Sequence, residues 1–159
     1  MVIRFYVVIK VDRYIMAIGG AGMTTLDMKT KQIIHSASVA AGSVALTPIP
    51  FTDAALLVPI QVGMITSLFK AYDQKIVTGA IRGAVWAVAA TSFGRGIVGN
   101  AFKFIPGLGT ATGAAISATT AVGVTELIGW AIAHELATGD KIAPGDIYGI
   151  IMNALKRRS

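Results

Sequence analysis

Two long stretches that almost lack charge, each interrupted by a proline turn, constrain the fold of this chain most. Between His35 and Lys70 the only ionisable side chain is Asp53, and residues 104–125 contain none. The first stretch turns at TPIPFTD, residues 47–53, and the second at FKFIPGLG, residues 102–109. A helix in water normally carries charges along a polar face. These helices must therefore hide most of their circumference in protein, in lipid, or in both.

Composition favours a membrane-associated protein without requiring a membrane span. Hydrophobic residues make up 54% of the chain and charged residues 14%, against roughly 25% charged residues in ordinary domains. The arms 36–52 and 54–69 reach only about 25 Å as helices, less than the ~30 Å of bilayer hydrocarbon. The hairpins could insert part-way, span a thinned bilayer, or form the core of a soluble helical oligomer.

Basic residues at the end of the chain favour an anionic membrane surface over nucleic acid. The formal net charge is +6, and the chain ends in Lys156, Arg157 and Arg158 before Ser159. Each Lys or Arg near an anionic membrane contributes roughly 1 kcal/mol of attraction. No basic stripe with interleaved aromatic residues, typical of nucleic-acid binding, accompanies these charges.

The hydrophobic pattern and the helix-ending residues predict an all-α fold of two helical hairpins with Pro/Gly turns and a C-terminal amphipathic helix. Helices are expected over approximately 24–46, 52–72, 75–101, 110–137 and 144–156. Residues 2–11 could form a short strand or a segment in the membrane interface. The chain then divides into an apolar segment with a Gly-rich linker (1–23), a hairpin domain (24–140) and an amphipathic helix with a basic tail (141–159).

The start of the chain lacks the features of a signal peptide. Its apolar residues are broken by four charged residues, Arg4, Lys10, Asp12 and Arg13. A signal peptide needs an unbroken apolar region followed by a cleavage site with small residues. We therefore expect the protein at the cytoplasmic side of the cytoplasmic membrane, with a soluble cytoplasmic assembly as the alternative.

Residues that could support chemistry are few and poorly spaced. AIGGAGMTT at 17–25 has the context of a phosphate-binding loop, but Met23 stands where the phosphate-reaching lysine belongs. The candidates for metal or acid–base chemistry, His35, Glu126, His134 and Glu135, lack metal-ligand spacing. Asp53 is expected to favour the positive end of a helix rather than to relay protons. We expect no enzymatic activity, no cofactor and no metal.

Two glycine pairs predict close packing between helices. Gly79 with Gly83, and Gly109 with Gly113, match G-x-x-x-G, a spacing that lets two backbones approach closely. The contact could lie within one subunit or between subunits. The sequence thus favours a homo-oligomer.

The turn motifs resemble a known helical family, the domain-of-unknown-function family number 697. The likeness covers roughly residues 30–138 and rests on two turns at matching separation, formed by Pro48, Pro50, Asp53, Pro106, Gly107 and Gly109. The resemblance implies a helical, membrane-associated domain, found also behind Era-like small GTPases, with no catalytic residues. This sequence departs from the family in two ways: no GTPase domain precedes the helices in it, and Asp73–Gln74 replaces a Tyr-Gly-type ending after Tyr72.

The expected function is therefore a non-enzymatic, self-assembling scaffold or structural module at a membrane. A regulatory or docking partner of a separate small GTPase is the first alternative. A pore or ion-conducting element that uses Asp53 is the second.

Overall fold

The computed structural model describes residues 25–46, 53–94 and 110–156, and these residues form an all-α fold. The helices are α2 (Thr25–Ala45), α3 (Asp53–Ala71), α4 (Thr78–Gly94), α6 (Thr110–Ala137) and α7 (Asp146–Lys156). The predicted fold class is confirmed, and no strand occurs in these ranges. The possible strand at 2–11, the two proline turns and the extension of the third helix to residue 101 lie outside the described residues.

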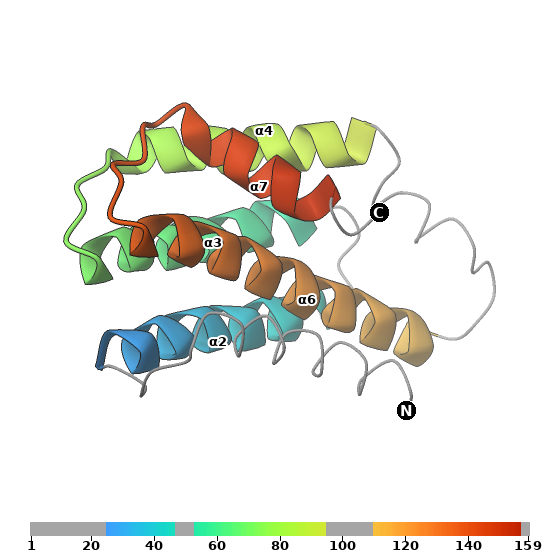
Figure 1. Cartoon of the computed structure of the whole chain (residues 1–159). Coiled ribbons are helices and arrows are strands. Elements are labelled where there is room, and N and C mark those ends of the chain that lie inside the picture. Colours follow the sequence, from blue (N-terminus) through green and yellow to red (C-terminus); the bar gives the residue numbers. More distant parts are fainter. Residues whose placement is uncertain (1–24, 47–52, 95–109, 157–159) are drawn as a thin grey trace.

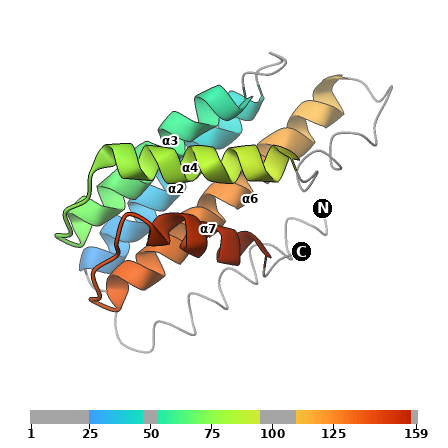
Figure 2. The ribbon, with the colours of Figure 1, turned by 90° about the horizontal axis from the view of Figure 1, so that it is seen from above.

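The five helices are stacked in three layers, with α2 in one outer layer, α3 and α6 in the middle, and α4 and α7 in the other outer layer (Figure 1). Figure 2 shows α4 uppermost and crossing above α3 and α6. One core joins all five helices. Its least exposed members include Ile34 of α2, Ile65 and Phe69 of α3, Val85 of α4, Ile132 of α6 and Ile151 of α7.

The first expected hairpin forms, whereas the arms of the second pack on other helices. Helix α2 packs against α3. Helix α6 packs mainly against α2 and also against α7 and α3, while α4 packs against α3 and α7. Two glycines explain the position of α6. A Cβ at Gly129 would lie 2.9 Å from Cγ1 of Ile34, and one at Gly42 would lie 2.7 Å from Cγ2 of Val122. Only a glycine permits the backbones of α2 and α6 to lie this close.

Helix α3 ends in a turn that glycine would normally form. The amide of Gln74 donates to the Phe69 carbonyl at 2.9 Å, and that of Asp73 donates to the Lys70 carbonyl at 3.2 Å. These two bonds define a Schellman motif, whose penultimate residue takes the left-handed conformation. Here that residue is Asp73, with φ of 55°. Because a left-handed backbone is costly for residues other than glycine, Asp73 is a strained residue at this corner.

The last helix begins with a reciprocal cap. The Ala143 amide donates to Oδ2 of Asp146 at 3.0 Å, and the Asp146 amide donates to the Ala143 carbonyl at 3.0 Å. A carboxylate three residues after the cap satisfies an amide that the helix leaves open. Pro144 lies between the two, where its missing amide costs nothing. Helix α6 ends at Ala137, and Gly139 follows with φ of +83°, as expected for the end of that helix.

Hydropathy is high, yet no helix in the described ranges is both long enough and apolar enough to cross a membrane. Several helices instead place large apolar side chains on the outside of the bundle. Among them are Val39 of α2 (68% exposed), Trp86 of α4 (44% exposed) and Tyr148 of α7 (37% exposed).

Candidate functional site

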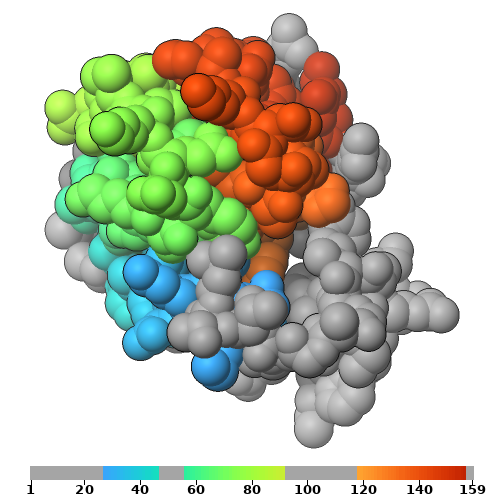
Figure 3. Space-filling view, turned by 60° about the vertical axis from the view of Figure 1, so that its left-hand side comes forward, coloured from blue at the N-terminus to red at the C-terminus, as the bar shows by residue number. Residues whose placement is uncertain are grey.

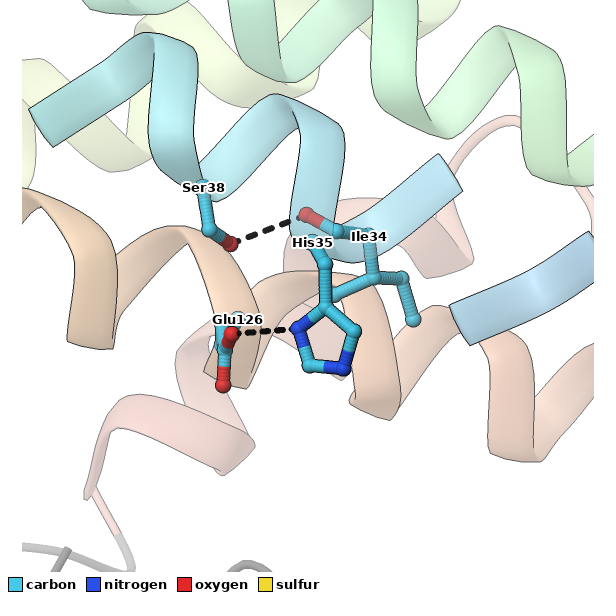
Figure 4. Close-up of polar contacts among 4 residues, drawn as sticks. All are labelled: Ile34, His35, Ser38 and Glu126. Carbon is cyan, nitrogen blue, oxygen red and sulfur yellow. Dashed lines mark hydrogen bonds and ion pairs between the residues drawn. The ribbon is translucent and has the colours of Figure 1, made fainter. Parts of the chain in front are cut away.

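A short polar contact between side chains joins α2 to α6. His35 Nδ1 lies 2.8 Å from Glu126 Oε1 (Figure 4). The His35 side chain is 51% exposed and that of Glu126 20%. The pair becomes a salt bridge when the imidazole is protonated. It pins α2 against α6 close to the glycine contacts described above.

An aromatic ring and two unsatisfied polar atoms adjoin this pair. The ring of Trp130 meets that of His35 edge to face, with ring centres 6.4 Å apart. Trp130 Nε1 and Thr125 Oγ1 are buried without a hydrogen-bond partner among the described residues. Ser38 is satisfied locally, because its hydroxyl donates to the Ile34 carbonyl at 2.9 Å (Figure 4). The contact between α2 and α6, which we call the α2–α6 seam, therefore contains polar groups as well as tightly packed apolar ones.

The His35–Glu126 contact holds α2 and α6 together. A histidine–carboxylate pair can orient a base, but it then needs a nucleophile or a substrate pocket on the other ring nitrogen. The hydroxyl of Ser38, drawn in Figure 4, donates to a carbonyl of its own helix. Within the described residues, no group of three or more metal-ligating side chains occurs. We interpret His35 and Glu126 as a tether between α2 and α6.

Sequence reasoning considered His35 and Glu126 but did not bring them together. They lie 91 residues apart in the chain, on two helices that both carry other polar residues. The only signal that the sequence offered for His35 and Glu126 was that each side chain can carry a charge. His134 and Glu135, the other two candidates, are exposed near the end of α6.

A second polar contact fastens the corner between α3 and α4 to the connection between α6 and α7. Gln74 Nε2 donates to the Asp140 carbonyl at 2.9 Å, and the Ile142 amide donates to Gln74 Oε1 at 3.4 Å. Figure 3 shows these two parts of the chain side by side, in green and in orange. One amide side chain therefore ties the loops at this end of the bundle together.

The third feature is the outer face of α4, which we define by Gly79, Arg82, Gly83, Trp86, Ala87 and Ala90. All six residues are exposed. Arg82 is the only charged residue of α4, and it forms no ion pair with any described residue. A Cβ placed at Gly83 would meet nothing within 4 Å. The face is therefore open to solvent, and Arg82 is its only charged side chain.

The residues singled out from the sequence fall on different parts of this structure. Gly79 and Gly83 lie on the outer face of α4, and neither packs against another helix among the described residues. Lys156 is exposed at the end of α7. Asp53 begins α3 and Gly113 lies in α6, but their side-chain surroundings are outside the description. The remaining residues lie outside the described ranges: Pro48, Pro50, Pro106, Gly107, Gly109, Arg157 and Arg158.

Comparison with known proteins adds no relative, since no family model, curated protein or solved structure matches this chain. The resemblance to the domain-of-unknown-function family number 697 therefore remains a prediction from the turn motifs.

Proposed function

We propose that this protein is a non-enzymatic scaffold that assembles with copies of itself at the surface of a membrane. The outer face of α4 is the observation that supports this proposal most strongly. A helix that covers only a core needs one apolar stripe and can be polar elsewhere. Helix α4 has its core stripe, with Ile81, Val85 and Val88 buried, and a second apolar surface outside.

An apolar surface in water is costly in proportion to its area, at roughly 25 cal/mol per Å². Trp86 is the largest side chain on this face and is 44% exposed. A contact that removes this ring from water lowers the free energy of the assembled state. Small residues beside the ring favour a flat partner, because they allow a neighbouring helix to approach closely.

The membrane part of the proposal is supported by charge and composition. The net charge is +6 and hydrophobic residues make up 54% of the chain. Lys29 on α2 and Lys156 at the end of α7 are exposed and can face anionic lipid. With ~1 kcal/mol for each basic residue near such a surface, a few lysines suffice for reversible attachment, and assembly multiplies them.

Two measurements test this proposal. The purified protein is mixed with vesicles of phosphatidylcholine alone or with phosphatidylserine, floated on a density gradient, and sized separately by sedimentation. We expect flotation with the anionic vesicles, weaker flotation at high salt, and a species larger than one subunit. A monomer that floats with neither vesicle contradicts the proposal. A large species that floats with neither leaves only the soluble assembly.

A further inference from the structure

We infer that the outer face of α4 is the contact between two copies of this chain, which pair there with their α4 helices antiparallel. This inference rests on the proposed self-assembly and specifies its interface. It follows from the arrangement of large and small residues along one line of the helix.

Four residues of the face form a continuous stripe. Gly79, Gly83, Trp86 and Ala90 are spaced four, three and four residues apart, which places them on one side of an α-helix. This is the spacing by which two helices interlock side chains in a coiled coil. Three of the four residues are small, and the fourth is the largest side chain available to a protein.

The order of these residues makes the stripe complementary to itself when it is reversed. In an antiparallel pair, Trp86 of one copy lies opposite Gly83 of the other, and Ala90 lies opposite Gly79. Both sets of contacts occur twice, as a two-fold axis requires. Each indole ring then lies against Gly83 of the second copy, where no side chain blocks its approach, since nothing lies within 4 Å of the Cβ position of Gly83.

A parallel pair would not pack in this way. It would place the two Trp86 rings against each other and leave the Gly79 and Gly83 positions facing one another across a gap. Close packing without voids is what stabilises a protein contact. The antiparallel arrangement therefore fits the shape of the face, and the parallel arrangement does not.

Arg82 acquires a partner in the same arrangement. It is exposed, it is the only charge of α4, and it has no ion-pair partner among the described residues. In the antiparallel pair it lies beside the second copy's Trp86, because that ring covers the adjacent Gly83. A guanidinium group stacks favourably on an indole ring. Trp and Arg are also the residue types that carry most energy in protein contacts.

This chemistry favours a second copy over lipid as the occupant. A helix that inserts into a membrane surface carries several bulky apolar side chains on its inserted face. Around Trp86 this face carries only Gly and Ala besides Arg82, and these small residues contribute little area to insertion and much to close helix contact.

Cross-linking tests the direction of the pair, and the chain is suited to it because it contains no cysteine. Gly79→Cys and Ala90→Cys proteins are prepared separately, and a short thiol cross-linker is applied to each alone and to their mixture. In the antiparallel pair the two copies of position 90 lie roughly 16 Å apart along the axis. We therefore expect dimers from the mixture and few from Ala90→Cys alone. Efficient cross-linking of Ala90→Cys alone would overturn the antiparallel pair.

Substitution tests the contact itself. Trp86→Ala and Gly83→Leu should each weaken dimerisation at least tenfold in sedimentation or mass photometry, with helicity retained in circular dichroism. Gly63→Leu is the control, because Gly63 is exposed on α3 with an equally open Cβ position, and it should leave dimerisation unchanged. An assembled wild type that both α4 variants leave intact would refute this interface while the proposed scaffold stands. A wild type that remains monomeric refutes both.

The same variants separate lipid from protein as the occupant. They are floated with phosphatidylserine-containing vesicles alongside the wild type. Because assembly multiplies the lysines at the membrane surface, we expect Trp86→Ala to lose vesicle binding only together with the dimer. Loss of vesicle binding with an unchanged oligomer would assign the face to the membrane and overturn the pairing.

Discussion

Gly129 sets the distance between α6 and its neighbours, and its replacement by alanine tests this packing directly. A Cβ there would lie 2.9 Å and 3.0 Å from Cγ1 and Cγ2 of Ile34, and 3.0 Å from Sδ of Met64. The methionine can move aside because its side chain is flexible. The isoleucine is buried with no exposed surface, so its two branches cannot yield without shifting α2.

Two opposing effects decide the outcome. Alanine in the interior of a helix is more favourable than glycine by about 0.8–1.0 kcal/mol. An extra carbon in a filled core costs about 1–3 kcal/mol. We therefore expect Gly129→Ala to lower the free energy of unfolding by up to about 2 kcal/mol, after the gain in helix propensity is subtracted.

Gly123 provides the matched control, since it lies in the same helix and a Cβ there would meet nothing within 4 Å. Gly123→Ala should raise the stability by about 1 kcal/mol, because only the propensity gain remains. Urea denaturation followed by circular dichroism, at equal protein concentration, measures both. The two variants should differ by about 1–3 kcal/mol. Equal stabilisation by both alanines would refute the close approach of α2 and α6.

A double substitution identifies the contact responsible. Ile34→Ala removes both Cγ atoms that the new Cβ would meet, and is itself destabilising. In that background Gly129→Ala should cost less than in the wild type, or become stabilising. Purely additive effects would mean that Gly129 and Ile34 do not share the contact.

Four further predictions concern the corner turns, the polar contacts and the nucleotide. Asp73→Gly should raise the free energy of unfolding by about 0.5–1 kcal/mol, because glycine takes a left-handed conformation without strain, whereas Asp73→Ala should not; equal effects would contradict the strain at Asp73. Gln74→Ala should cost about 1 kcal/mol and speed hydrogen exchange at the Ile142 amide, and unchanged exchange there would argue against the Gln74 bridge. In a double-mutant cycle, His35→Ala and Glu126→Gln should couple by about 0.2–1 kcal/mol, less at high salt, since the pair is partly exposed; zero coupling would exclude the tether. Calorimetry with GTP or ATP and magnesium should give no saturable heat, because Met23 replaces the lysine of a phosphate-binding loop.

The helices could be predicted from sequence because strong local signals mark their ends. Prolines, threonine caps and the return of charge placed the first, second and fourth helices close to the observed bounds of α2, α3 and α6. The third was expected from residue 75, but α4 begins at Thr78. Residues 75–77, which follow the turn around Asp73 and belong to no helix, account for the difference. That turn normally requires glycine, so the aspartate at its centre gave no signal for it.

The pairing of helices could not be predicted in the same way. Helix α6 lies on α2 because Gly42 and Gly129 face bulky side chains of other helices. Neither belongs to the G-x-x-x-G pairs on which the sequence analysis relied. A glycine pair records only that a helix can be approached closely, and not which helix approaches. The contact between His35 and Glu126 could not be predicted for the same reason, since it depends on the packing of α6 against α2.

The buried glycines and the exposed glycines of this chain have different roles. Side chains of the same chain occupy the space beside Gly42 and Gly129, so these two glycines determine how closely α2 and α6 pack. Gly83 is open and lies three residues from an exposed tryptophan on a helix with one charge. A bundle that needed only to fold could carry a lysine or glutamate at that position, with a gain in helix propensity and in solubility. A glycine open to solvent beside a large exposed ring instead supports the proposal that this surface pairs with another copy of the chain.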